Sequence, residues 1–199
     1  MKELKQRKIW DPVTRLWHWA LVISVTAGLL MGEFMSFSNI QWHFYAGYLT
    51  GSLLLFRLVW GLIGPEPIRL SRLIPTPSAT IVYLKGIGSR SPSGSPGHNP
   101  LGSLSVIAII LLLGAQVLTG LFIESDDFFE SGPLAHYASE AMVSKMTWLH
   151  HLISKGVFGI IAIHISAILF YLIWKRENLI RPMITGLKWV KTDKFDDSQ

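Results

Sequence analysis

The sequence LGSLSVIAIILLLGAQVLTGLFI at positions 101–123 carries no charged side chain over 23 residues. As an α-helix with a rise of 1.5 Å per residue it is about 34 Å long, enough to cross a hydrocarbon core of about 30 Å. Three more apolar stretches have a similar length: residues 16–35, 42–63 and 148–174. The sequence therefore predicts an all-α, four-helix membrane bundle in one domain over residues 1–199. An amphipathic helical tail at 178–190, broken at Pro182, completes the prediction.

The composition supports a membrane protein and narrows the chemistry. Only 16% of the residues are charged, against about 25% in an ordinary soluble protein. Such a chain has too few charges to cover a surface that faces water. The absence of cysteine excludes disulfides, iron–sulfur clusters, zinc–thiolate sites and covalent attachment of haem to thiols. The seven histidines are therefore the first candidates for chemistry.

The positive charges predict the orientation of the chain. Fifteen of the 18 lysines and arginines fall in the N-terminal arm, the link between the second and third stretches, and the C-terminal tail. Cytoplasmic segments of membrane proteins are enriched in these residues, so both termini are predicted to be cytoplasmic. The acidic loop that contains ESDDFFE at 124–130 then faces outward. Since topology and anionic lipid account for the basic residues, no nucleic-acid partner is expected.

Four histidines sort into two pairs by helical facing and by depth. His150 and His164 are 14 residues apart, about 40° short of four helical turns, so they project from nearly one face about 21 Å apart. His151 projects from nearly the opposite face to His164. His18 lies at the same depth as His164, in the inner half of the membrane. His43 lies at the same depth as His150, near the outer surface.

Each pair has the arrangement of two axial ligands to one haem iron, held between facing helices. A single histidine in a membrane helix commonly hydrogen-bonds to a neighbour, but the agreement of facing and depth across four of them favours haem. A zinc site would gather its ligands at one depth. The glycine pairs Gly28/Gly32 and Gly47/Gly51 permit close helix contact, room for a porphyrin, or both.

Several longer motifs then carry a family resemblance. They are WDPVTRLWHW at 10–19, HFYAGYLTGSLLLFRLVWGLIG at 43–64, GHNPLG at 97–102, QVLTGLF at 116–122, GPLA at 132–135, LHH followed by His164 at 149–164, and NLIRPMITG at 178–186. With these, residues 9–188 resemble the prokaryotic cytochrome b561 family, which includes the cytochrome b subunit of Ni/Fe hydrogenases.

The resemblance implies a dihaem cytochrome b of the bacterial inner membrane. It implies two haem b groups, an inner one on His18 and His164 and an outer one on His43 and His150. Electrons would pass between a periplasmic redox partner, of hydrogenase or cytochrome c type, and the membrane quinone pool. His151 remains an alternative to His150 as the outer ligand.

Three secondary sites each have two interpretations. Arg57, in the second stretch, either contacts a haem propionate or extends to the lipid headgroups. His98 and Asn99, in GHNP, either hydrogen-bond a quinone oxygen or supply turn and helix-cap chemistry. The acidic outer loop either docks a basic partner or is simply solvated.

Two other functions stay open on the sequence. One is a non-redox membrane anchor subunit whose histidines only pack. The other is a stand-alone oxidoreductase that couples a small reductant such as superoxide to quinone. The sequence contains no nucleophile–base pair and no acid–base dyad, so no catalytic side chain is predicted. Any catalysis is limited to quinone reduction or quinol oxidation.

Overall fold

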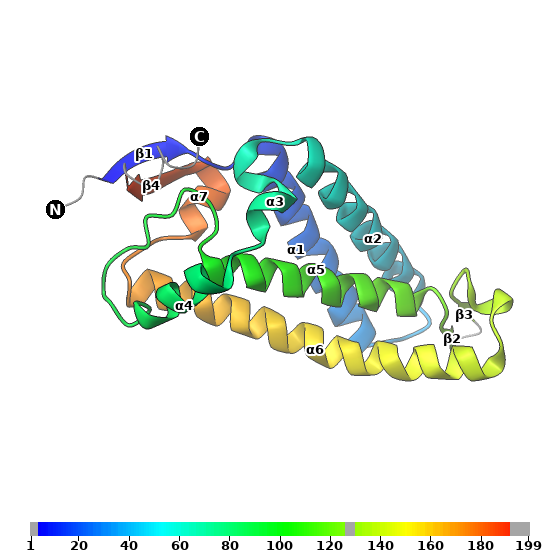
Figure 1. The fold of residues 1–199 in the computed structure, drawn as a ribbon. Helices are drawn as coiled ribbons and strands as arrows, with labels where there is room; N and C mark the ends of the chain where they lie inside the picture. Colours follow the sequence, from blue (N-terminus) through cyan, green and yellow to red (C-terminus); the bar gives the residue numbers. More distant parts are fainter. Residues whose placement is uncertain (1–3, 126–129, 192–199) are drawn as a thin grey trace. The chain divides into compact units, whose positions relative to one another are not determined.

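The computed structural model describes residues 4–125 and 130–191, most of which are helical (Figure 1). Four long helices contain most of the four predicted stretches: α1 (Pro12–Glu33), α2 (Ile40–Ile63), α5 (Pro100–Gly120) and α6 (Glu140–Ile173). Residues 34–35, 121–123 and 174 of those stretches lie beyond the helix ends. Each is long and apolar enough to cross a membrane, with a mean hydropathy between 1.3 and 2.4 over its best window. The all-α prediction with four spans is confirmed.

Polar residues just outside the apolar stretches fix where the helices begin. The Asp11 carboxylate accepts the backbone N–H of Thr14 at 3.0 Å and so caps α1. The Ser139 hydroxyl accepts from the backbone of Met142 at the start of α6. Because α6 begins at Glu140, it is eight residues longer at this end than the apolar pattern predicts. Residues 140–147 include the charged Glu140 and Lys145, so they lengthen the helix beyond its apolar stretch.

The surfaces of these helices are apolar and largely uncovered by protein. Leu55 and Leu111 are each 67% exposed and Ile163 is 62% exposed. Within the best 18-residue window of each helix, only 11–28% of the residues are buried. A soluble protein does not present such continuous apolar area to water, whereas lipid tails cover it at no cost.

Shorter elements connect the spans. Between α2 and α5 they are η1 (Glu66–Ile68), α3 (Leu70–Leu73) and α4 (Pro77–Lys85). Between α5 and α6 they are β2 (Glu124–Ser125), β3 (Glu130–Ser131) and η2 (Ala135–Tyr137).

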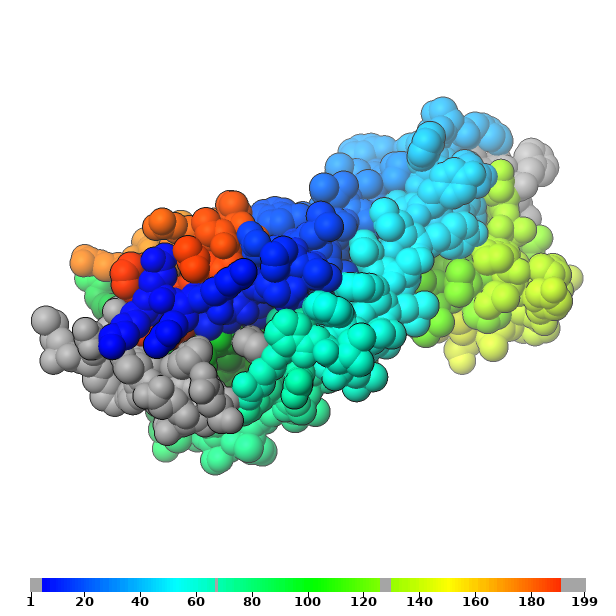
Figure 2. All heavy atoms as spheres, turned by 90° about the horizontal axis from the view of Figure 1, so that it is seen from above, coloured from blue at the N-terminus to red at the C-terminus, as the bar shows by residue number. Residues whose placement is uncertain are grey.

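The two ends of the described chain form a β-ribbon that the sequence analysis did not predict. Strand β1 (Leu4–Lys8) pairs antiparallel with β4 (Leu187–Lys191), residue 4 opposite 191 and residue 8 opposite 187. Figures 1 and 2 show the blue N-terminal strand beside the orange-red C-terminal segment. Beneath it lies a small buried cluster: Ile9, Trp10, Ile68 and Val190, packed against Trp60 and Met183.

The prediction of a helical tail over 178–190 is only partly right. Helix α7 (Ile180–Thr185) covers six residues, ends at Gly186, whose φ is 81°, and is followed by β4. Pro182 does not break this helix. It is the third helical residue, where a backbone N–H has no intrahelical acceptor, so its missing proton costs nothing.

The described chain separates into two compact units. The first comprises residues within 1–16, 58–108 and 161–199, and the second comprises 17–57 and 109–160. The four long helices contribute residues to both. The single-domain interpretation of the sequence remains a prediction.

Candidate functional site

His43 and His150, predicted from the sequence as one pair, face each other in the second unit. His43 lies near the start of α2 and His150 lies in α6, and their ring centroids are 6.2 Å apart. A metal–imidazole bond is roughly 2 Å long, so two imidazoles on opposite faces of one haem iron have centroids about 6 Å apart. The separation of the two rings therefore fits a bis-histidine haem.

Hydrogen bonds to backbone carbonyls fix the orientation of both rings. Nδ1 of His43 lies 2.9 Å from the carbonyl oxygen of Gly28. Nδ1 of His150 lies 3.0 Å from the carbonyl oxygen of Gln116 and 3.2 Å from Oγ1 of Thr119. A carbonyl can only accept, so Nδ1 carries the proton in each ring. Nε2 is then left as the metal-binding atom, the usual arrangement around haem and zinc histidines.

Glycines leave space next to these rings. A Cβ at Gly32 would come within 3.2 Å of Cε1 of His43, and one at Gly120 within 3.0 Å of Cε1 of His150. A cavity of about 490 Å³ lies beside the pair, and Gly28 and Gly47 are part of its lining. Cofactor pockets in proteins span roughly 300–1,000 Å³. The donor set, the spacing and the cavity all fit a haem.

Two of the four glycines singled out in the sequence also serve helix packing. A Cβ at Gly28 would meet Cβ of Ala46 at 3.7 Å, and one at Gly51 would meet Val117 at 3.1 Å. Gly28 therefore brings α1 close to α2, and Gly51 brings α2 close to α5. Close helix contact and room beside the histidines occur together in this unit.

Gln116 and Thr119 of α5 belong to the site and were not predicted as site residues. The side-chain amide nitrogen of Gln116 lies 2.9 Å from Nε2 of His150, the atom that would bind iron. Its side-chain oxygen is buried and has no hydrogen-bond partner among the described residues. The motif QVLTGLF placed both residues on one helix, but helical spacing alone does not show which histidine they contact.

His151 differs from His150 in its surroundings. Its side chain is exposed, and its ring centroid is 6.3 Å from that of His150 at an interplanar angle of 85°. The His150 ring, in contrast, lies 6.2 Å from that of His43, and its Nδ1 is held by two acceptors. The geometry thus favours His150 as the partner of His43.

His18 and His164 lie in different units, so each is described by itself. His18 is in α1, with its ring edge-on to Trp19 at 5.3 Å. His164 is half-buried in α6, the same unbroken helix that carries His150. Their pairing remains a prediction from helical facing and depth.

Arg57 of α2 is 3% exposed, so its guanidinium does not extend to the surface. It lies 5.7 Å over the ring of Trp17, whose indole N–H donates to the Leu53 carbonyl at 2.8 Å. The aromatic face holds the cation electrostatically. This arrangement places a buried cation beside the indole of Trp17.

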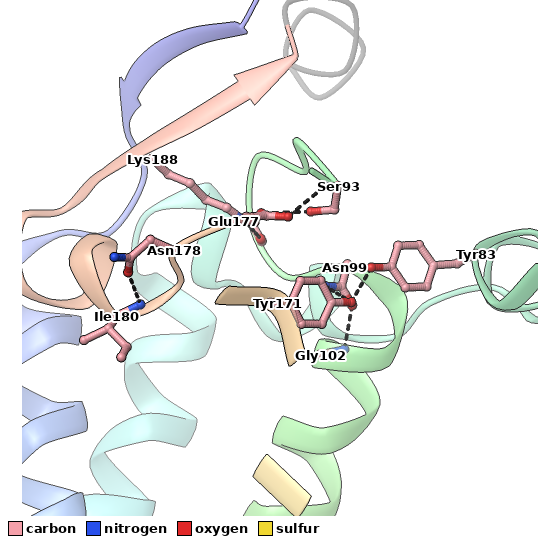
Figure 3. A network of polar contacts seen from close by, with 10 residues as sticks. Tyr83, Ser93, Asn99, Gly102, Tyr171, Glu177, Asn178, Ile180 and Lys188 are labelled. Carbon is pink, nitrogen blue, oxygen red and sulfur yellow. Dashed lines mark hydrogen bonds and ion pairs between the residues drawn. The ribbon is translucent and has the colours of Figure 1, made fainter. Parts of the chain in front are cut away.

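Asn99 and His98, in the first unit, have contrasting surroundings. Asn99 is 7% exposed. Its side-chain oxygen accepts the Gly102 N–H at 2.9 Å and caps α5, and its amide nitrogen donates to the Tyr171 hydroxyl at 3.1 Å (Figure 3). His98 is exposed, with its ring 4.8 Å from that of buried Trp10. The cap chemistry foreseen for Asn99 is therefore present.

Tyr83 of α4 extends this network outside the membrane spans. Its hydroxyl is hydrogen-bonded to that of Tyr171. Burial of Tyr83, followed by this hydrogen bond, raises the pKa of its phenol well above the ordinary value of 10. The Tyr83 hydroxyl therefore stays protonated at physiological pH and stays available as a hydrogen-bonding group.

The acidic outer loop is described only in part, since residues 126–129 of ESDDFFE lie outside the described residues. Its flanks, β2 and β3, form a short antiparallel ladder with Glu124 opposite Ser131 and Ser125 opposite Glu130. Glu124 is exposed. Within residues 4–125 and 130–191, no group of three or more His, Cys, Asp or Glu residues could hold a metal ion without a prosthetic group.

Comparisons with known proteins identify the family of this chain. Residues 9–186 match the model of the family described as prokaryotic cytochrome b561. The probable Ni/Fe-hydrogenase B-type cytochrome subunit of Azotobacter vinelandii is 22% identical, over 94% of this chain and 90% of the relative. Its Rhizobium leguminosarum bv. viciae counterpart is 24% identical, over 92% and 89%. The probable Ni/Fe-hydrogenase 1 B-type cytochrome subunit of Escherichia coli (strain K12) is 21% identical, over 59% and 60%.

The match spans all four membrane helices and includes the histidine pair in its cavity. Membership of this family implies haem b as a cofactor and membrane electron transfer as the role. The chain therefore belongs to the prokaryotic cytochrome b561 family, and it is a multi-pass protein of the bacterial inner membrane.

Proposed function

We propose that this chain is a dihaem cytochrome b that carries electrons between a periplasmic redox partner and the membrane quinone pool. The observation that carries the proposal is the His43–His150 pair. The two rings are 6.2 Å apart, and each directs Nε2 away from a carbonyl that accepts its Nδ1 proton. Packing alone does not require both rings to hydrogen-bond through Nδ1 and to leave Nε2 for a metal beside a cavity.

The protein side chains supply ligation, orientation and charge. His43 and His150 would hold the outer haem, and His18 and His164 the inner one. When bound, haem b supplies a reversible one-electron couple. Two histidines per iron leave no open position for a substrate, which favours electron transfer over oxygen activation.

Two other sites follow from the chemistry of their residues. Buried Arg57 would pair with a haem propionate, since a guanidinium forms bidentate hydrogen bonds with a carboxylate. Exposed His98 would hydrogen-bond a quinone oxygen on the cytoplasmic side. The second amide hydrogen of Asn99, beyond the one donated to Tyr171, could serve the same quinone.

The partner is proposed from the relatives and from charge. The relatives are named as hydrogenase cytochrome subunits, so a periplasmic hydrogenase is the first candidate and a cytochrome c the second. With both termini in the cytoplasm, as the lysine and arginine distribution predicts, the acidic 124–130 loop faces the periplasm. It would attract a basic docking surface.

Single-histidine variants test the haem assignment. We expect His43→Ala and His150→Ala each to lose the same haem, since one axial ligand cannot hold a bis-histidine haem in place. His18→Ala and His164→Ala should lose the other one. The measurement is a dithionite-reduced minus oxidised spectrum of the purified protein, with extracted haem counted per chain. Wild type should contain two haems.

His151→Ala is the matched control, since it removes the same ring one residue away and should retain both haems. Loss of the outer haem in His151→Ala but not in His150→Ala would reverse the ligand assignment. Wild-type protein without haem, after expression with ample haem supply, would leave a non-redox membrane anchor as the better account. Oxidation of superoxide by the purified chain alone would favour the stand-alone oxidoreductase.

A further inference from the structure

The loop at residues 88–99 has a composition that cannot fix its own conformation. It is rich in Ser, Pro and Gly and contains no large apolar side chain. Such sequences are normally exposed and flexible. Nevertheless Ser93 and Ser95 are each 8% exposed, and Asn99 is 7% exposed. The loop is therefore held by other parts of the first unit.

Side chains from the C-terminal end of the chain hold the start of this loop. The indole N–H of Trp174 donates to the carbonyl of Gly88 at 3.0 Å, and the ammonium of Lys175 donates to that of Ser89 at 3.1 Å. Trp174 and Lys175 directly follow α6. The loop thus begins against the end of the fourth membrane helix.

A buried ion pair holds the middle of the loop (Figure 3). Glu177 accepts the backbone N–H of Ser93 at 2.7 Å and its hydroxyl at 2.9 Å. Lys188 lies 3.5 Å from the same carboxylate, and the two side chains are 7% and 8% exposed. The Lys188 ammonium also donates to the carbonyl of Gly97 at 3.0 Å.

Burying two opposite charges usually contributes little net stability, because desolvation offsets their attraction. Leaving only one of them buried is strongly unfavourable. The pair is therefore better suited to selecting one conformation of the loop than to adding stability. The residue after Gly97 is His98, and Asn99 then caps α5, which begins at Pro100.

We propose that Glu177 and Lys188 are positioning residues for quinone, which fix the 88–99 loop so that His98 and Asn99 meet the quinone oxygen in one arrangement. Asn99 is held from its other side by Tyr171, whose hydroxyl is in turn bonded to Tyr83 (Figure 3). The inference rests on the proposed quinone site and names the side chains that preorganise it.

The test compares variants of the haem-loaded protein in detergent. Lys188→Met keeps most of the unbranched side chain and removes its charge. Lys188→Arg keeps the charge and the donors. Lys85→Met makes the same chemical change at an exposed lysine at the end of α4 and is the matched control. Each variant is first checked for an unchanged haem content and reduced spectrum.

Two readouts follow for each variant. The first is hydrogen exchange of the amides at 91–99, which we expect to be about tenfold faster in Lys188→Met than in wild type. The second is reduction of the haems by decylubiquinol, with a menaquinol analogue in parallel. For Lys188→Met we expect KM to rise about tenfold while kcat stays within about twofold, the pattern of lost substrate positioning. Lys188→Arg and Lys85→Met should resemble wild type in both readouts.

A double variant that removes both charges of the pair serves as a second test if Lys188→Met alone folds poorly. Glu177→Gln with Lys188→Met leaves no unpaired buried charge, so its effect on KM should be smaller than the product of the single effects. Faster amide exchange at 91–99 in Lys188→Met together with an unchanged KM for quinol would show that Glu177 and Lys188 have only a structural role. That result would overturn the proposal. Failure of both quinols to reduce the wild-type protein would overturn the proposed quinone reaction itself. Hydrogen exchange needs no quinol, so it would still show whether Lys188 fixes the loop, and the two failures can be told apart.

Discussion

At the scale of single residues, His150 is more tightly constrained than its position in the sequence suggests. Its Nδ1 faces both a carbonyl and the Thr119 hydroxyl, and its Nε2 faces the Gln116 amide. All three contacts come from two residues of α5, Gln116 and Thr119, which are three positions apart. A ligand held by its neighbours in this way loses little entropy when it binds a metal. Gln116 must turn aside from Nε2 for iron to bind there.

Gly120 gives a test of this constraint. A Cβ there would lie 3.0 Å from Cε1 of His150, so Gly120→Ala must displace the ring by a few tenths of an ångström. We expect the outer haem to bind roughly 10–100-fold more weakly, as when groups that orient a metal ligand are disturbed. Haem retention during size-exclusion chromatography, followed by the reduced spectrum, measures this.

Gly114→Ala is the control on the same helix, because a Cβ at Gly114 meets nothing within 4 Å. It should retain both haems. Equal haem retention in the two variants would show that the space at Gly120 is not needed.

The proximity of His43 and His150 could be predicted because the signals for it are local, whereas their role as haem ligands stays a prediction. Helical periodicity gave the facing of His150, and the distance from the ends of the apolar stretches gave its depth. Thr119 and Gln116 could not be assigned in the same way. Their contacts depend on how far α5 is rotated against α6, which no single-helix pattern contains.

At the scale of elements, Gly186 is where the chain changes from helix to strand. Its φ of 81° lies in the left-handed region that favours glycine. Its carbonyl accepts the backbone N–H groups of Ile9 and Trp10 at 2.9 and 3.3 Å. A Cβ at this position would lie 2.6 Å from the Trp10 carbonyl oxygen. One residue therefore ends α7 and also joins it to the segment after β1.

We expect Gly186→Ala to destabilise the protein. The left-handed conformation costs a side chain about 1–2 kcal/mol, and the contact with Trp10 adds to this. Hydrogen exchange at Ile9 and Trp10 should accelerate, and the midpoint of thermal unfolding in detergent should fall. Gly88→Ala is the control, since a Cβ at Gly88 meets nothing within 4 Å. Equal exchange in both variants would contradict the assigned role of Gly186.

The prediction of a helical tail over 178–190 was wrong beyond Gly186, where the chain changes to a strand. Residues 187–191, LKWVK, contain three apolar and two basic side chains. A stretch of five residues is too short to distinguish the period of a strand from that of a helix. The glycine before them is a helix-end signal that favoured the strand. The partner strand is at residues 4–8, so the pairing depends on contacts between opposite ends of the chain, which local patterns do not reveal.

At the scale of the whole molecule, Tyr83 makes the free energy of unfolding fall at alkaline pH. The pKa of its phenol is raised in the folded protein, first by burial and then by the hydrogen bond to Tyr171. An unfolded chain therefore releases this proton at lower pH than the native one. The contribution is complete below about pH 10, the ordinary tyrosine pKa, and is lost progressively as the pH rises above it.

Tyr83→Phe should flatten this dependence. We expect the free energy of unfolding of wild type to fall between pH 10 and 11 more steeply than that of the variant. The difference should be below the limit of about 1.4 kcal/mol per pH unit for one proton. Denaturant unfolding in detergent at pH 8, 10 and 11 measures it. Tyr137→Phe, at a tyrosine that is 79% exposed, is the control. Parallel curves for wild type and Tyr83→Phe would contradict the prediction.

The β1–β4 ribbon also sets an order of events during biosynthesis. Residues 4–8 leave the ribosome before the four spans, yet their backbone partners at 187–191 emerge only after all four spans have been made. During that interval β1 is an unpaired basic strand, and Trp10 lacks the Val190 side of its cluster. Pairing of β1 with β4 is therefore a late step, which follows insertion of the four spans. Once paired, the two strands stabilise each other.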